Sequence, residues 1–145
     1  MGLVDILWGL DLLAGRAEAV GADFLLSGPV NLWLRGLRGP PGEARFVLLT
    51  SNVYGDLLER ALSVGSTRLG SPGDLPGVVD GVRFHGLVRG YTVTLLVDPA
   101  VRGLDGRIVR VDVSAEARRA AHAIVGGRVV RLAPLGVEVL LWGDV

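Results

Sequence analysis

The turn at residues 27–29 has the composition of a helix start that can bind an anion. Ser27 and Gly28 follow a short apolar run, and Pro29 suits the first helical position, where its missing N–H costs nothing. Free backbone N–H groups and the helix dipole favour an anion there. Three nearby arginines could add charge-assisted hydrogen bonds: Arg35, Arg38 and Arg45. The competing interpretation is an ordinary capped helix with solvated arginines.

The remaining polar residues offer little for catalysis or for metal binding. Cysteine is absent, which excludes a disulfide framework and a thiolate metal site. The two histidines, His85 and His122, have no His or Glu at metal-ligand spacing on the same face. Turn chemistry and a polar strand face account for three aspartates: Asp98, Asp105 and Asp112. The sequence therefore predicts no catalytic residue, no metal site and no cofactor.

Hydrophobic periodicity predicts the elements that position these residues. Apolar residues at three- and four-residue steps predict helices, whereas short apolar runs and alternation predict strands. The predicted helices cover about residues 3–20, 29–37, 52–64 and 114–125. The predicted strands cover residues 24–26, 46–49, 78–85, 91–97, 108–113, 129–132 and 137–142, with a glycine-rich loop at 65–77. Ser27 is expected to cap the second helix, and Ser51 or Asn52 the third.

The order of these elements indicates the fold class. Helices alternate with strands in the first half of the chain, and strands dominate the second half. This order predicts an α/β or α+β fold with a small mixed β-sheet flanked by helices. The chain of 145 residues has the length of one domain, and neither a linker nor a repeat divides it. We therefore expect a single domain over residues 1–145.

The segment FLLSGPVNLWLRGLRGPPGEARFVLL, residues 24–49, resembles the start of minimal nucleotidyltransferase-like domains. In that family a strand ends in a Gly-Gly or Gly-Ser turn, a helix and an Arg-containing loop follow, and the next strand carries an Asp-x-Asp pair. A later strand supplies a third carboxylate. The resemblance in element order covers residues 3–97. It implies a nucleotidyltransferase-like fold, and a nucleotide as the ligand of the turn at 27–28 and its arginines.

The residues that would perform the family's chemistry are replaced. The turn reads Ser-Gly where the family begins with glycine, and residues 43–46 read Glu-Ala-Arg-Phe where the paired aspartates would stand. Thr94 stands at the third carboxylate position. Two-metal phosphoryl transfer needs carboxylates to hold Mg²⁺. The resemblance together with these replacements predicts a non-catalytic protein of this fold that serves as a binding or regulatory module.

Two alternatives remain open. An active nucleotidyl- or phosphotransferase could use unconventional acids, with Glu43, Asp56 and Asp98 as the candidates. A structural interaction domain of an unrelated α/β fold would instead use its hydrophobic strands and tryptophans as the functional surface.

Composition restricts the partners and the location that we expect. Fifteen acids balance fifteen basic residues, so no long-range field attracts nucleic acid. No apolar run reaches the roughly 18 residues of a membrane span, and no basic region marks a signal peptide, so we expect a cytoplasmic protein. Half of the residues are hydrophobic, which favours a homo-oligomer or a protein partner that covers the excess. Every basic residue is arginine, which fits a GC-rich, thermophilic source.

Overall fold

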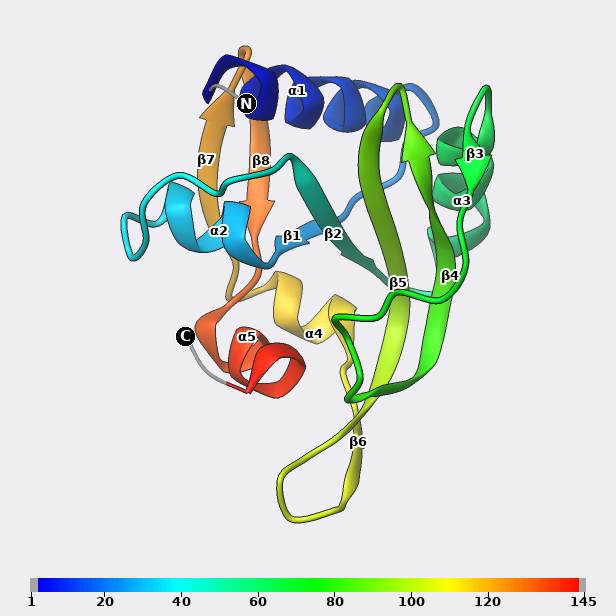
Figure 1. Cartoon of the computed structure of the whole chain (residues 1–145), viewed down its shortest axis with the longest axis vertical. Helices are drawn as coiled ribbons and strands as arrows, with labels where there is room; N and C mark the ends of the chain where they lie inside the picture. The colour runs from blue at the N-terminus through cyan, green and yellow to red at the C-terminus, as the bar shows by residue number, and fades with distance from the viewer. Residues whose placement is uncertain (1–2, 144–145) are drawn as a thin grey trace.

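The computed structural model describes residues 3–143, and Figure 1 shows how their helices and strands are arranged. The helices of this range are α1 (Leu3–Ala19), α2 (Pro29–Leu34), α3 (Gly55–Ser63), α4 (Val113–Ala117) and α5 (Leu135–Trp142). The strands are β1 (Leu25–Ser27), β2 (Arg45–Thr50), β3 (Thr67–Arg68), β4 (Val78–Val88), β5 (Tyr91–Arg102), β6 (Ile108–Arg110), β7 (Ala121–Val125) and β8 (Arg128–Leu132). None of the helices between residues 3 and 143 is long and apolar enough to cross a bilayer.

The strands form one mixed sheet in the order β3-β4-β5-β2-β1-β8-β7, and β6 pairs with the end of β5. The central strand β2 lies parallel to β5 and antiparallel to β1. β1 lies parallel to β8, and β7 and β8 form an antiparallel hairpin. Helices cover both faces of β1 and β2, which explains why the sequences of these strands are continuous apolar runs.

Side-chain alternation along β2 separates two hydrophobic clusters. Phe46 and Leu48 point to the face that α1 and α3 cover, where they pack with buried residues of those helices. Val47 and Leu49 point to the opposite face, where residues of α4 and α5 cover them. Because successive side chains of a strand point to opposite faces, each position on β2 has one set of helices as its neighbours.

The predicted fold class, a mixed sheet flanked by helices, is confirmed. α1, β1 and β2 begin and end within one residue of their predicted bounds, whereas α2 ends three residues before its predicted end. The predicted helix caps are wrong. Ser27 lies inside β1, Gly28 takes the cap position of α2, and Tyr54 takes that of α3, each without a side-chain hydrogen bond to the helix.

Two predictions for the last third of the chain are also wrong. The predicted helix over 114–125 ends at Ala117, and residues 121–125 form β7. The cause is the turn at Gly126 and Gly127, whose φ angles of 59° and 78° build a two-residue hairpin that pairs β7 with β8. The predicted strand over 137–142 is helix α5, because a short apolar run suits a buried helix as well as a strand.

The middle of the chain holds longer strands than predicted. β4 continues to Val88, and a tight turn at Arg89 and Gly90 replaces the loose connection. β5 continues through Asp98 to Arg102, so the turn-rich segment predicted at 98–106 begins only after that strand. The predicted strand over 108–113 is shortened to β6, and the predicted loop over 65–77 contains the short strand β3.

Candidate functional site

Three strands bring Ser27, Val47 and Thr94 into one row across the centre of the sheet. Ser27 at the end of β1 pairs with Val47 of β2, and Val47 pairs with Thr94 of β5. Paired residues on neighbouring strands point to the same side of a sheet. The three side chains therefore share the face that α5 covers, and all three are buried. The row joins the predicted anion-binding turn to the positions where the resemblance places carboxylates.

The row contains no carboxylate. Residues two apart on a strand share a face, so Arg45 and Val47 are the pair that accompanies Thr94. The alternative pair in the window 43–46, Ala44 and Phe46, is buried on the opposite face beneath α1 and α3. Neither pair includes an acid, and Glu43, the acid of this window, is exposed in the loop before β2. Within residues 3–143, no group of three His, Cys, Asp or Glu side chains is placed to hold a metal ion.

At Thr94, where the resemblance places a carboxylate, the structure has a histidine contact, and Arg45 lies on the same face of the sheet. Nδ1 of His85 lies 2.7 Å from Oγ1 of Thr94. Arg45 forms an ion pair with Asp74, and its Nε and Nη2 are buried with no hydrogen-bond partner in the described part of the chain. Burial lowers the pKa of Arg45, against the attraction of Glu43. Burial, followed by the charge of Arg45, also lowers the pKa of His85. The positive charge of the Arg45 guanidinium makes this place unfavourable for a metal cation.

At the other end of the row, the carboxylate of Glu138 occupies the predicted anion-binding turn. The backbone N–H of Gly28 donates to Oε2 of Glu138 at 2.9 Å, and Nδ2 of Asn31 donates to Oε1 at 2.9 Å. The hydroxyl of Ser27 supplies a third hydrogen bond. The Glu138 side chain is fully buried. We call Ser27, Gly28 and Asn31 the anion cradle; its occupant is a side chain of the same protein.

Helix α5 carries this occupant and a second contact one turn later. Trp142 lies four residues after Glu138, so both side chains point from the same side of the helix. Its Nε1 donates to the hydroxyl oxygen of Ser27 at 3.2 Å. A Cβ built at Gly28 would lie 3.1 Å from the Trp142 ring, so glycine permits this close approach. α5 is therefore held on the cradle by a carboxylate and an indole together.

Arg35 completes the polar contacts behind the cradle. Its Nε donates to Oδ1 of Asn31 at 3.0 Å, and its Nη2 donates to the carbonyl oxygen of Ala133 at 2.7 Å. Asn31 donates to the same carbonyl oxygen at 3.1 Å. Burial raises the pKa of Glu138, although its three hydrogen-bond donors and the charge of Arg35 act in the opposite direction. The cradle thus binds the carboxyl group in a site that opposes its ionisation.

The structure brings most of the predicted binding residues to one place. Ser27 and Gly28 form the cradle, and Arg35 supports it. Arg38 lines a hollow of about 100 Å³ together with Gly28 and Trp142. Arg45 lies on β2 two residues before the partner of Ser27, and there it faces Asp74. The sequence did not predict Glu138 as the occupant of the cradle. Its one signal in the sequence is that it is an acid inside an otherwise apolar run.

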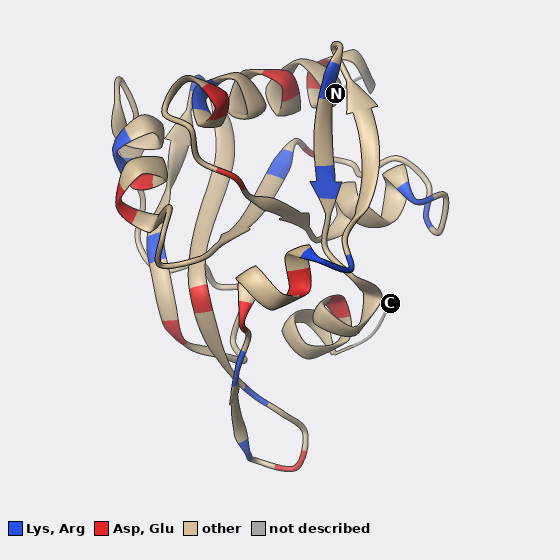
Figure 2. Cartoon of the chain, turned by 180° about the vertical axis from the view of Figure 1, so that it is seen from behind, with Lys and Arg blue, Asp and Glu red and all other residues tan. Residues whose placement is uncertain are grey.

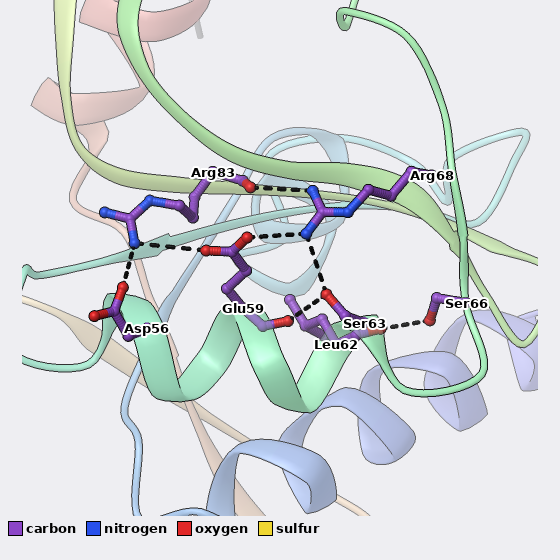
Figure 3. Close-up of polar contacts among 7 residues, drawn as sticks. All are labelled: Asp56, Glu59, Leu62, Ser63, Ser66, Arg68 and Arg83. Carbon is purple, nitrogen blue, oxygen red and sulfur yellow. Dashed lines mark hydrogen bonds and ion pairs between the residues drawn. The ribbon is translucent and has the colours of Figure 1, made fainter.

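The acids of the active-transferase alternative are far apart. Asp56 lies on α3 and pairs with Arg83 of β4 at 2.6 Å, in an ion-pair network that braces α3 against β3 and β4 (Figure 3). Asp98 accepts hydrogen bonds from the backbone N–H groups of Asn52 and Val113, each at 3.0 Å. Glu43 precedes β2, whereas Asp98 lies beyond its other end. Six residues of strand separate them, which is roughly 20 Å.

The charged side chains of the whole fold are also spread out. Seen from behind, basic and acidic residues are scattered over strands, helices and loops without a field of one sign (Figure 2).

Three solved structures share this arrangement of helices and strands. TM1012, a candidate nucleotidyltransferase from Thermotoga maritima, matches with a TM-score of 0.65 at 15% identity, over 95% of this chain and 83% of that chain. The antibiotic-resistance factor ANT(2'')-Ia matches with a TM-score of 0.58 at 14% identity, over 96% of this chain and 70% of that chain. The structure of ANT(2'')-Ia in complex with adenylyl-2''-tobramycin also matches with a TM-score of 0.58 at 14% identity, over 94% of this chain and 72% of that chain. The fold is that of the nucleotidyltransferases.

At 14–15% identity, these likenesses establish the nucleotidyltransferase fold alone. No protein-family model matches the chain. None of the curated proteins matches it either. The activity of a chain with the nucleotidyltransferase fold depends on the groups in its site, so function must be argued from the row and the cradle.

Proposed function

We propose that this chain is a non-catalytic protein of the nucleotidyltransferase fold that serves as a binding or regulatory module. The observation that carries the proposal is the row of Ser27, Val47 and Thr94, in which no member is an acid and which has the guanidinium of Arg45 on the same face. Two-metal phosphoryl transfer needs carboxylates that hold Mg²⁺ against the phosphates. A guanidinium at this place repels a divalent cation, and valine and threonine supply no charge to hold one.

The occupied anion cradle supports the same proposal. An incoming phosphate would compete with Glu138 for the N–H of Gly28 and for the amide of Asn31. Glu138 has the advantage in this competition because it belongs to the same chain, and tethering raises its effective concentration. The protein thus presents its own carboxylate where a transferase of this fold would meet its substrate's phosphates.

Nucleotide or anion binding at Ser27, Gly28, Arg35, Arg38 and Arg45 is the second candidate function. One observation favours it: the cradle holds the carboxyl group of Glu138 with two donors at 2.9 Å. In this proposal a nucleotide displaces Glu138 and binds without Mg²⁺, because Arg45 supplies positive charge in place of the metal. The module would then report the presence of a nucleotide without altering it.

Nucleotide turnover tests the first proposal. The protein is incubated with ATP, GTP, CTP and UTP in Mg²⁺, and the products are separated by anion-exchange chromatography. We expect no turnover above that of a protein-free blank. Mg²⁺-dependent turnover above the blank would overturn the proposal, and its loss in a Glu43→Ala, Asp56→Ala or Asp98→Ala variant that circular dichroism shows to be folded would establish the active-transferase alternative.

A further inference from the structure

The two edges of the sheet differ in how they are protected. One edge is β3, a strand of two residues whose Arg68 pairs with Glu59 of α3 at 2.9 Å (Figure 3). A strand this short, with a charged residue, offers little backbone for another chain to join. The other edge is β7, a strand of five residues that pairs with β8 alone. Within residues 3–143, no backbone group outside the β7–β8 hairpin bonds to β7.

The hairpin turn determines which backbone groups of β7 point outward. Val125 and Arg128 flank the two-residue turn, so they form the hydrogen-bonded pair that closes the hairpin. Hydrogen-bonded and non-hydrogen-bonded pairs alternate along an antiparallel ladder. The N–H and C=O groups of Ala123 therefore point to β8, whereas those of His122 and Ile124 point to the open edge. β7 presents four unpaired backbone groups there.

The side chains of β7 lack the features that usually protect an edge. Residues 121–125 read Ala-His-Ala-Ile-Val, with no lysine, no acid and no proline. Ile124 is 78% exposed, and Val129, its cross-strand partner on β8, is 62% exposed. α1 packs against this hairpin (Figure 1), where Asp11 and Glu18 pair with Arg128 of β8, and Trp8 of α1 is 70% exposed. The open edge is thus continuous with exposed apolar side chains.

We infer that β7 pairs with β7 of a second copy of this chain, antiparallel and about a two-fold axis at Ala123. The occupant is a second copy because an uncharged strand meets no like charge when it faces itself. A chain of copies joined edge to edge would need β3 as the other half of each contact, and β3 is too short. The contact is therefore isologous and closes after two copies.

The pairing has one register. The outward groups of His122 meet those of Ile124 in the partner copy, and those of Ile124 meet His122, which gives hydrogen-bonded pairs on both sides of the axis. Ala123 then faces itself across the axis as a non-hydrogen-bonded pair, with Cα atoms about 4.5 Å apart. Ile124 lies roughly 8 Å from Ile124 of the other copy, because the two are offset by two residues at about 3.3 Å each.

Cysteine cross-linking tests this register directly, because the natural chain has no cysteine. A disulfide needs Cα atoms about 4.4–6.8 Å apart, so Ala123→Cys fits and Ile124→Cys does not. Each variant is oxidised at equal concentration, and the covalent dimer is followed by non-reducing electrophoresis. We expect Ala123→Cys to cross-link at least tenfold faster than Ile124→Cys and than Leu104→Cys, a fully exposed control on the turn after β5.

The mass in solution completes the test. Sedimentation equilibrium of the natural chain should give twice the 15.3 kDa of one copy, and Ile124→Lys should give one copy, while Leu104→Lys keeps two. Circular dichroism shows that each variant is folded. A monomeric natural chain at about 100 μM, a dimeric Ile124→Lys protein, or equal cross-linking of Ala123→Cys and Ile124→Cys would overturn the inference. This inference does not depend on the site being non-catalytic.

Discussion

Removal of the Glu138 carboxyl group should destabilise the fold by an amount that the cradle predicts. Glu138→Ala leaves the buried N–H of Gly28 without an acceptor, whereas Asn31 keeps its bond to the carbonyl oxygen of Ala133. A buried donor without a partner costs about 1–3 kcal/mol, and Asn31 loses part of its hydrogen bonding as well. We expect the free energy of unfolding to fall by about 2–4 kcal/mol.

Glu138→Gln separates hydrogen bonding from charge. Glutamine keeps one acceptor oxygen, so we expect a smaller loss, about 1–2 kcal/mol. Burial raises the pKa of Glu138 above its ordinary value of 4.5, so the folded chain keeps this proton to a higher pH than the unfolded chain does. The stability that the retained proton provides is complete below pH 4.5, the ordinary value, and is lost as the pH rises through the raised pKa. Glutamine does not titrate, so the stability of Glu138→Gln should not fall over this pH range.

Urea unfolding at pH 5 and pH 8, followed by tryptophan fluorescence, measures both effects. Glu43→Ala is the matched control, because Glu43 is an exposed acid and its loss should change stability by less than about 0.5 kcal/mol. If Glu138→Ala unfolds within 0.5 kcal/mol of the natural chain, the carboxylate is not a structural ligand of the cradle. If the natural chain and Glu138→Gln respond to pH alike, the raised pKa is refuted.

Three further predictions concern the surroundings of the site. Burial lowers the pKa of His85 below 6.5, so the unfolded chain binds this proton first and the stability of the protein should fall as the pH drops below 6.5. His85→Gln should show a smaller fall when thermal unfolding is followed against pH. The same pH dependence in the natural chain and in His85→Gln would contradict this prediction. Asp98→Ala should cost about 1–2 kcal/mol in urea unfolding, because it removes the acceptor of one exposed and one part-buried backbone N–H group, and an unchanged midpoint would refute this role. A Cβ at Gly86 would lie 2.5 Å from a carbonyl oxygen of β3. Gly86→Ala should therefore expose the amides of β3 to hydrogen exchange, and unchanged protection would count against that contact.

The sequence was sufficient for the first half of the fold because its signals there are local. The apolar runs at 24–26 and 46–49 are buried strands, and the stripe over 3–20 is a helix, in close agreement with their predicted bounds. The resemblance of residues 24–49 to nucleotidyltransferase-like domains also predicted the fold that the solved structures share.

The second half depends on contacts between distant residues, which periodicity does not report. The apolar run at 137–142 becomes a helix because one side of it packs on the sheet while Glu138 reaches a turn more than one hundred residues earlier. The hairpin of β7 and β8 required the positive φ of both Gly126 and Gly127, and the same glycines also suit a helix end. Tertiary context decided both cases.

The sequence predicted the turn that forms the cradle, but not the side chain that occupies it. Ser27 and Gly28 could be found because a small polar turn before a helix attracts anions. Glu138 could not, since a lone acid in an apolar run is equally consistent with a solvated surface position. The strand registers were also needed to show that Arg45, and not Ala44, shares the face of Thr94.

The most direct test of the non-catalytic account is thermal unfolding of the natural chain with ATP, GTP, CTP and UTP, each with and without Mg²⁺. A ligand at 100 times its dissociation constant adds about 2.7 kcal/mol, a shift of several degrees. The account predicts that Mg²⁺ adds nothing to the shift produced by any of the four nucleotides. A nucleotide that stabilises the protein by several degrees only when Mg²⁺ is present would show that the chain holds a metal site and would contradict the account.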